Sequence, residues 1–68
     1  MEKTATVDRA SVVKSKHSGQ ISVVTAKRAN GWSTYAFWAN GSNKMGVCQD
    51  WRLAVATHAK VEQIVKDW

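Results

Sequence analysis

The chain has 68 residues, a formal net charge of +5, a single cysteine and no proline. A chain of this length forms one domain and buries only ~60% of the surface that it exposes when unfolded. The lone Cys48 excludes a disulfide framework and favours a reducing compartment. Since neither a signal peptide nor an apolar run of ~20 residues is evident, we expect a soluble, cytoplasmic protein.

Basic side chains are concentrated in the middle of the chain. Between Asp8 and Asp50 there is no acidic residue, and six basic ones are present: Arg9, Lys14, Lys16, Lys27, Arg28 and Lys44. This stretch also contains Asn30-Gly31 and Asn40-Gly41, and Asn-Gly between apolar runs is the strongest short-range hairpin signal. The positive charge therefore coincides with a predicted β-meander, which favours a polyanionic or acidic partner.

Four strands are predicted ahead of one helix. We expect the strands over about 10–16, 20–29, 32–39 and 42–48, joined by turns at Ser18-Gly19, Asn30-Gly31 and Asn40-Gly41. The β-branched and aromatic residues of the second and third segments favour strands. Residues 1–7 are expected to form a loosely ordered N-terminus, and residues 8–68 the single domain.

The last segment predicts a helix that begins after Asp50, a good N-cap residue, and runs to the C-terminus. Its apolar residues recur at spacings of three and four: Leu53, Ala54, Thr57, Val61, Ile64, Val65 and Trp68. This stripe favours a helix packed on its own sheet over a coiled coil. The predicted fold class is therefore α+β, with an antiparallel meander of three to four strands followed by one C-terminal helix on one face.

Turn lengths predict which side chains share a face of the sheet. With two-residue turns, Lys16 pairs with Ile21, Ala29 with Trp32, and Ala39 with Ser42. One face then includes Val13, Val24, Arg28, Tyr35, Phe37 and Lys44, and the other includes Lys14, Lys16, Ile21, Val23, Lys27, Trp32, Trp38 and Met45. Because burying an unpaired ammonium costs several kcal/mol, we expect the helix on the first face. The apolar residues of the second face would also make a core, and a bulge would reverse part of this assignment.

On this interpretation the uncovered face is the candidate binding site. It presents Lys14, Lys16, Lys27, Trp32 and Trp38, and Arg28, next to the Asn30-Gly31 turn, is added to them as a sixth candidate for nucleic-acid or partner binding. Lysines neutralise phosphates, and indole rings stack on bases. The alternative interpretation is that the tryptophans belong to the core and the lysines are ordinary solvated charge.

Motifs for catalysis or metal binding are not evident. His17, His58 and Cys48 lack the spacing of metal ligands. The carboxylates lie in the first eight residues or in the predicted helix, so no acid–base pair is indicated. We therefore predict a protein that is not an enzyme and that uses no cofactor or metal.

The order of strands and helix resembles that of small nucleic-acid-binding modules. Double-stranded-RNA-binding domains also end in β-β-β-α, but Gln49-Asp50-Trp51-Arg52 does not match the lysine-rich start of their last helix. Tyr35-Ala36-Phe37 resembles a fragment of the RNA-recognition-motif signature, without the βαββαβ order of that family. These partial resemblances do not establish membership of any family.

Two functions are compatible with these patterns. We predict a small basic nucleic-acid-binding protein, for DNA or RNA, that uses the lysine and tryptophan side chains of one sheet face. The alternative is a small protein-binding inhibitor or adaptor, such as small proteins of mobile elements often are. It would dock an acidic partner or form a homodimer through the same face. A membrane partner is not expected, because the polar side of the helix carries charges of both signs.

Overall fold

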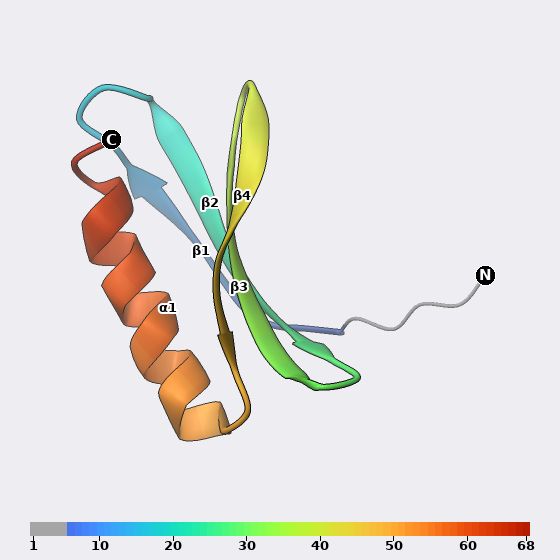
Figure 1. Cartoon of the computed structure of the whole chain (residues 1–68). Helices are drawn as coiled ribbons and strands as arrows, with labels where there is room; N and C mark the ends of the chain where they lie inside the picture. The colour runs from blue at the N-terminus through green and yellow to red at the C-terminus, as the bar shows by residue number, and fades with distance from the viewer. Residues whose placement is uncertain (1–5) are drawn as a thin grey trace.

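The computed structural model describes residues 6–68 of the chain. Its elements are β1 (Thr6–Lys14), β2 (Gln20–Arg28), β3 (Gly31–Trp38), β4 (Gly41–Cys48) and α1 (Trp51–Val65). The strands form one antiparallel sheet in the order β1-β2-β3-β4, and α1 lies across one side of it (Figure 1). This arrangement confirms the predicted α+β meander with a C-terminal helix. The loosely ordered N-terminus predicted for residues 1–7 falls mainly on residues 1–5, which lie outside the described residues.

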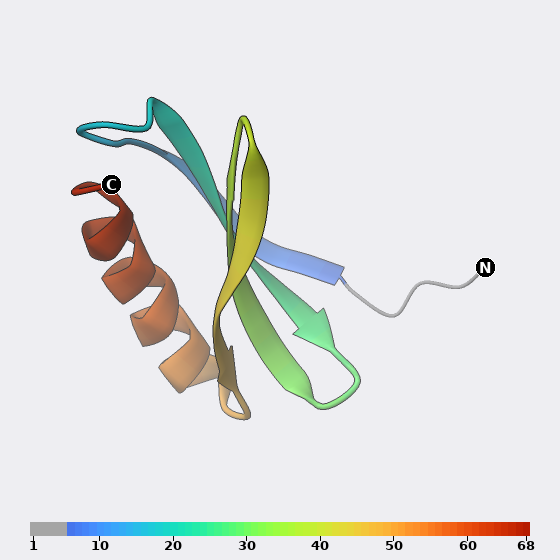
Figure 2. The same ribbon diagram turned by 45° about the horizontal axis from the view of Figure 1, so that its top comes forward.

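The helix covers the opposite sheet face from the one predicted. Ile21, Val23 and Ala36 are completely buried beneath it, together with Val65 of α1 itself. The remaining core side chains are Val13 and Val61, with Trp38, Met45 and Trp68 packed at the margin. The face with Val24, Tyr35 and Phe37 stays free of the helix, as the turned view in Figure 2 makes clear.

The register of β1 explains why the predicted face was wrong. Val13 pairs with Ile21 and Lys14 with Gln20, so the β1–β2 connection is a loop longer than two residues. The difference from the predicted register is an odd number of residues, and an odd shift turns every side chain of a strand to the other face. Lys14 thus lies on the opposite face from Ile21 and Lys16 leaves the sheet, whereas Lys27 stays on the face of Ile21 but is exposed at the end of the sheet.

Contacts with the end of the helix hold the β1–β2 loop in this longer form. The backbone N–H of Lys16 donates to the carbonyl oxygen of Lys66 at 2.8 Å, and that of His17 donates to the carbonyl oxygen of Trp68 at 2.6 Å. Carbonyl groups at a helix C-terminus have no partner within the helix, so they need outside donors. The loop supplies them, and Ser15 N–H closes it internally by donating to Gly19 O at 2.7 Å.

Both Asn-Gly turns form where they were predicted, but with a different geometry. Arg28 pairs with Gly31, and Trp38 with Gly41, so each glycine is the first residue of a strand. An Asn-Gly pair at the centre of a type I′ turn needs a positive φ at both residues. Neither asparagine has one, and of the two glycines only Gly31 does, with φ +127°. At each turn the observed pairing differs from the predicted one by two residues. An even shift leaves side chains on the same face, so the residues of β2 and β3 that were predicted to share a face do share one.

The helix begins as predicted, but its buried side is rotated from the predicted stripe. Asp50 is the N-cap, and its Oδ1 accepts a hydrogen bond from the backbone N–H of Arg52 at 3.0 Å. The buried residues are Ala54, His58, Val61 and Val65. Leu53 is 59% exposed and Ile64 is 43% exposed, so these two large apolar side chains face outward. A histidine stands near the centre of the buried side instead.

Candidate functional site

The six residues predicted to form one platform are divided between the two faces of the sheet. Lys14 and Arg28 lie on the face without the helix, whereas Lys16 lies in the β1–β2 loop. Lys27 and Trp32 pair with each other on the helix side, at the end of the sheet near the β2–β3 turn. The prediction of a single platform is therefore wrong.

The tryptophans all lie on the helix side. Trp38 packs edge-on against Trp68, with ring centroids 5.4 Å apart and an interplanar angle of 88°. Trp32 packs against Trp51 at the opposite end of the helix, with centroids 5.7 Å apart. These pairs lie at the two ends of the interface between α1 and the sheet. Trp38 packs against the core, as the alternative interpretation had it, whereas Trp32 is not among the residues that do so.

The face opposite the helix, called the open face here, is formed by alternate residues of all four strands. Two cross-strand rows make its centre: Ala10, Val24, Tyr35 and Lys44 in one, and Val12, Ser22, Phe37 and Ser42 in the other. Lys14 lies beyond the second row, and Ala26, Arg28, Ser33 and Val47 lie beyond the first, toward the β2–β3 turn.

Two aromatic rings stand side by side at the centre of the open face. Tyr35 and Phe37 are alternate residues of the inner strand β3, so their side chains point the same way. Their ring centroids are 5.9 Å apart with an interplanar angle of 34°, and Phe37 is 42% exposed. The open face thus offers an aromatic surface to the solvent.

Basic side chains approach the aromatic pair from the neighbouring strands. Arg28 of β2 donates a hydrogen bond from Nη1 to the hydroxyl oxygen of Tyr35. The Nζ atom of Lys44, on β4, lies 6.0 Å from the centroid of the Tyr35 ring. Lys14 adds a third positive charge at the other end of the face, beside β2 residue Gln20.

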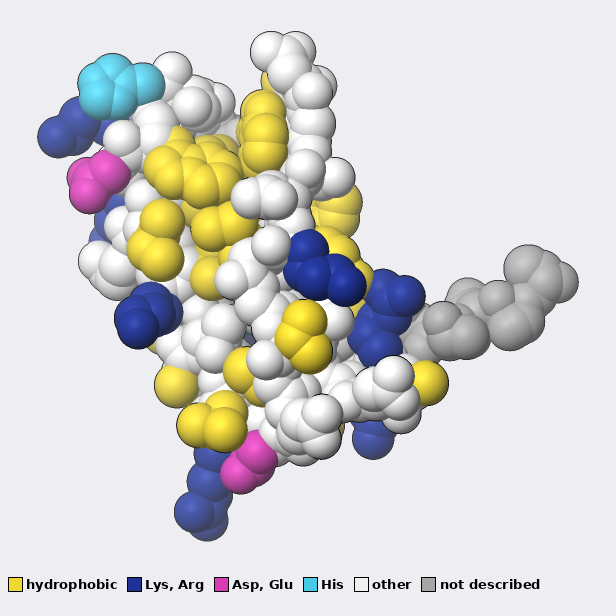
Figure 3. Space-filling view, viewed as in Figure 1, with side chains coloured by type: hydrophobic (Ala, Val, Ile, Leu, Met, Phe, Trp, Pro, Cys, Tyr) yellow, Lys and Arg dark blue, Asp and Glu magenta, His cyan; other side chains and the backbone are white. Residues whose placement is uncertain are grey.

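The acidic side chains that the structure describes lie away from the open face. Asp8 accepts a hydrogen bond from Trp32 Nε1 at 2.8 Å, Asp50 caps α1, Glu62 contacts His58, and Asp67 follows the helix. On the side of the molecule away from the helix, Figure 3 shows Lys and Arg side chains without an Asp or Glu beside them. The open face is therefore electropositive over the part of the chain described.

A hollow of about 280 Å³ lies at the end of the open face beside the β2–β3 turn. Its lining consists of Arg28, Ala29, Asn30, Gly31, Ser33, Lys44 and Val47. Two of the three basic residues of the open face therefore border the same small space. Val47, which lines the hollow, is 59% exposed. Val12, farther along the open face, is 64% exposed.

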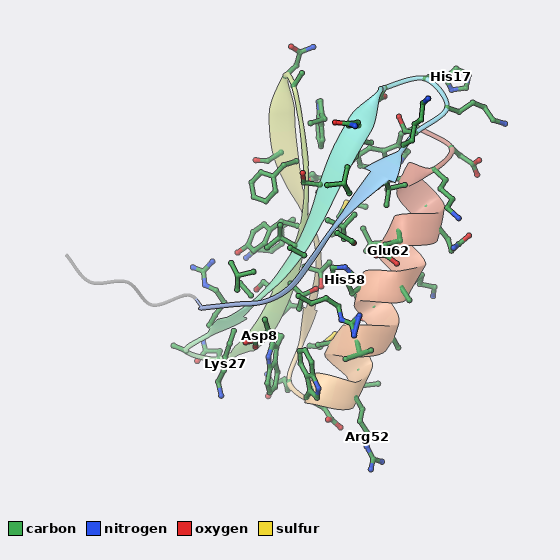
Figure 4. The ribbon with its side chains drawn as sticks, turned by 180° about the vertical axis from the view of Figure 1, so that it is seen from behind. Asp8, His17, Lys27, Arg52, His58 and Glu62 are labelled. Atoms are coloured by element: carbon green, nitrogen blue, oxygen red, sulfur yellow. The ribbon has the colours of Figure 1, made fainter. Side chains whose placement is uncertain are left out.

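A second aromatic and charged cluster lies on the helix side of the sheet. The Nζ atom of Lys27 stands 5.0 Å above the Trp32 ring, whose indole N–H is already donated to Asp8. Asp8 and Lys27 lie close together at this end of the molecule in Figure 4. Because the cluster contains a carboxylate and its polar groups bind one another, it is less suited than the open face to attract an anion.

His58 joins the helix to the sheet through a buried chain of hydrogen bonds (Figure 4). Its ring is 1% exposed; Nδ1 lies 2.7 Å from Thr25 Oγ1, which lies 2.9 Å from Thr34 Oγ1. Nε2 lies 2.9 Å from Ser11 Oγ and 3.3 Å from a carboxylate oxygen of Glu62. Burial lowers the pKa of His58 below its ordinary 6.5; the nearby Glu62 opposes this shift and Arg9 adds to it.

This network has the residue types of a nucleophilic triad but a different geometry. In a triad the nucleophile and the acid contact opposite nitrogens of the histidine. Here Ser11 and Glu62 both contact Nε2, and a threonine hydroxyl contacts Nδ1. The arrangement satisfies polar groups inside the core, so we assign it a structural role.

Within residues 6–68 no three His, Cys, Asp or Glu side chains are grouped as metal ligands would be. Within the same range α1 is neither long enough nor apolar enough to span a membrane.

Sequence reasoning missed the aromatic centre of the open face. Tyr35, Phe37 and Lys44 were placed together, but on the face expected beneath the helix. The alternation of Tyr35 and Phe37 on a strand indicates an aromatic surface. Without the register of β1, however, the sequence does not show that this surface faces away from the helix.

Comparison with known protein families, curated proteins and solved structures finds no match to this chain. The fold and the site define a small α+β domain with an uncovered aromatic and basic sheet face, and its function has to be argued from that face.

Proposed function

We propose that this protein binds single-stranded nucleic acid on the open face of its sheet. The observation that carries this proposal is the Tyr35–Phe37 pair on the open face, half-buried at Tyr35 and exposed at Phe37, which has basic side chains on both neighbouring strands and no described carboxylate beside it. Aromatic rings on a sheet stack with bases of any sequence, and cations beside them neutralise phosphates. Both requirements for binding a single strand are therefore present on one surface.

The dimensions of the site favour a single strand over a duplex. Four strands spaced about 4.8 Å apart make a surface about 14 Å across before side chains are added, which is wider than the ~12 Å major groove. The Tyr35 and Phe37 centroids are 5.9 Å apart, whereas successive bases in a duplex rise by about 3.4 Å. Two bases that stack on these rings have to separate from each other, as only a flexible strand allows.

The first test is the change in fluorescence anisotropy of labelled oligothymidylate, oligouridylate and a mixed-sequence duplex. We expect the single strands to bind more tightly than the duplex, and binding to weaken steeply between about 50 and 200 mM salt. The relative affinities for the thymidylate and uridylate strands decide between DNA and RNA. Absence of binding to all three at the lower salt concentration would contradict the proposal.

The role of the aromatic pair is tested by Phe37→Ala. Loss of one stacking ring is expected to weaken single-strand binding about tenfold or more, since each stacked base contributes ~1–3 kcal/mol. Leu53→Ala is the matched control: Leu53 is also an exposed apolar side chain, 59% exposed, but it lies on the helix. Equal effects of the two substitutions would remove the open face from consideration.

The role of charge is tested by replacing Lys14, Arg28 and Lys44 together by Gln. The slope of log affinity against log salt is expected to decrease by about two, because each phosphate contact on a single strand contributes about 0.7. The control replaces Lys16, Lys60 and Lys66 by Gln, which removes the same charge from exposed positions outside the open face. If both triple variants lose affinity equally, only the net charge matters and the site is wrong.

Protein binding is the second candidate, supported by the exposed apolar side chains of the open face. Val12 and Val47 are 64% and 59% exposed, and stacking with bases does not require them. A partner for this surface would carry apolar side chains with carboxylates around them. A second copy of the chain fits less well, because two open faces would bring six positive charges together. A monomer at all concentrations in light scattering, with no oligonucleotide binding, would favour this second candidate.

A further inference from the structure

Two cations on the open face converge on one tyrosine. Arg28 reaches Tyr35 from β2, where its Nη1 donates to the phenol oxygen, and Lys44 reaches the same ring from β4, with Nζ 6.0 Å from its centroid. Both side chains also line the hollow beside the β2–β3 turn. The strand between them, β3, contributes Gly31 and the buried Ser33 to the lining of that hollow.

This arrangement brings like charges together without a described counter-charge. No Asp or Glu is among the residues that line the hollow. The two cations repel each other, and an anion between them would relieve this repulsion. Arginine presents a planar fork of donors that matches phosphate oxygens, and lysine provides a compact point charge. The pair is therefore better matched to a phosphate group than to a halide ion.

The hollow has room for a phosphate group together with waters of its hydration shell. Its volume is about 280 Å³, just below the range of about 300–1,000 Å³ that is typical of small-molecule pockets. A water molecule accounts for about 30 Å³ of liquid volume, so a phosphate fits together with several of its hydration waters. A complete nucleotide would have to extend out of the hollow, over the Tyr35 ring.

We propose that the hollow between Arg28 and Lys44 is a phosphate-binding site. In the nucleic-acid complex, which rests on the proposed function, this site holds the phosphate next to the base that stacks on Tyr35. The bound strand would then run along β3, from the hollow over Tyr35 to Phe37, with Lys14 at its far end. Two sources of the phosphate are distinguishable by experiment, namely a terminal monoester and an internal diester.

The site is tested first with inorganic phosphate alone, titrated into the isotopically labelled protein at constant ionic strength against chloride. We expect saturable shifts of the backbone amide signals of Gly31, Ser33 and Val47 in nuclear magnetic resonance spectra. The shifts should disappear in the double variant Arg28→Gln, Lys44→Gln. They should persist in the control Lys16→Gln, Lys60→Gln, which loses the same charge at exposed positions outside the open face.

A charge-preserving variant keeps this test valid if the double glutamine variant fails to fold. Arg28→Lys with Lys44→Arg retains both cations, so it should retain phosphate binding with a changed affinity. Shifts that do not saturate, or that are equal around Lys16 and Lys60, would overturn the proposal, because they indicate general ion association.

Nucleotides distinguish the two sources of phosphate. We expect thymidine 5′- or 3′-monophosphate to bind about tenfold more tightly than thymidine, in line with a hydrogen bond to a charged group, and the double glutamine variant to lose this difference. A dinucleoside phosphate that binds as well as the monophosphate identifies an internal diester as sufficient, whereas weaker binding identifies a terminal phosphate.

The outcomes for the phosphate site and for the proposed function are separable. If oligothymidylate binds the wild-type protein and the double glutamine variant equally, the phosphate site is overturned while single-strand binding stands. If inorganic phosphate binds in the hollow and no oligonucleotide binds at any salt concentration, the phosphate site stands and the proposed function fails.

Discussion

His58 is the side chain on which the interior of this small domain depends most. It is 1% exposed, and its ring links α1 to β2 through Thr25 and to β1 through Ser11. Removing one member of a buried hydrogen-bonded network leaves the polar groups that it contacted without partners. We expect His58→Gln to lower the free energy of unfolding by about 1–3 kcal/mol, as measured by urea denaturation followed by circular dichroism.

The pH dependence of stability follows from the lowered pKa of His58. Because the folded protein holds the His58 proton less tightly than the unfolded chain, the unfolded state binds more protons below pH 6.5. The stability that neutral His58 contributes is therefore complete above this value and is lost as the pH falls through the folded-state pKa. The loss between about pH 7 and pH 5 should be smaller in His58→Gln. Parallel curves for the wild-type protein and His58→Gln would contradict this assignment.

Gly31 and Gly41 follow asparagine in the same dipeptide but differ in what surrounds them. A Cβ atom at Gly31 would overlap the carbonyl oxygen of Cys48, and φ is +127°. At Gly41 the nearest atom to a Cβ would be Cζ2 of Trp38 at 3.5 Å, an ordinary contact.

Alanine substitutions at these two glycines should therefore differ in cost. We expect Gly31→Ala to destabilise the protein by at least ~1–3 kcal/mol and Gly41→Ala to stay within about 0.5 kcal/mol of wild type. Thermal unfolding measures both. Equal costs would mean that β4 does not approach Gly31 as closely as described.

At the scale of elements, α1 shows how a helix can have apolar side chains on more than its buried side. Val65 is completely buried against the sheet, whereas its neighbour Ile64 is 43% exposed. Gly46 of β4 permits the close approach on the Thr57 side, since a Cβ there would lie 2.9 Å from Thr57 Cγ2.

Adjacent substitutions in α1 should separate these two environments. We expect Val65→Ala to cost about 2 kcal/mol, from lost burial and the cavity left behind, and Ile64→Ala to cost less than about 1 kcal/mol although it removes a larger side chain. Urea denaturation of the two variants provides the comparison. The opposite order would mean that Ile64, and not Val65, is buried against the sheet.

At the scale of the whole molecule, the single helix leaves one face of a two-layer structure uncovered. The Cα positions extend 34 × 28 × 14 Å, so the sheet has broad faces and little depth. All four tryptophans of the chain lie on the helix side, where they form the Trp32–Trp51 and Trp38–Trp68 pairs. Tryptophan emission therefore reports on one face of the protein.

This distribution predicts a specific optical result for oligonucleotide binding. A strand on the open face should raise the anisotropy of the labelled oligonucleotide while tryptophan emission changes little, because no indole ring is available there for stacking. Strong quenching that accompanies the anisotropy change would place the strand at the Lys27, Trp32 and Trp51 cluster instead. Trp51→Phe, which alters only that cluster, would then reduce the quenching.

About half of the candidate site could be read from the chain. Lys14 and Arg28 were identified from the acid-free basic segment, and both lie on the open face. Tyr35, Phe37 and Lys44 were grouped correctly on one face, because the pairing at the β3–β4 turn differs from the predicted one by an even number of residues. They were assigned to the wrong side of the sheet, since that choice depended on Lys14, Lys16 and Lys27 sharing the face of Ile21.

The sequence by itself determined the order of the elements, the positions of the hairpins and the start of the helix, because local backbone preferences and side-chain periodicity govern these features. Only the tertiary structure decided the register of β1 and the face that α1 covers. The reason is that the β1–β2 loop donates its N–H groups to the carbonyl oxygens of Lys66 and Trp68. Those hydrogen bonds join residues that are far apart in the sequence, and they hold a longer loop in place of a two-residue turn. Local sequence patterns therefore cannot predict them.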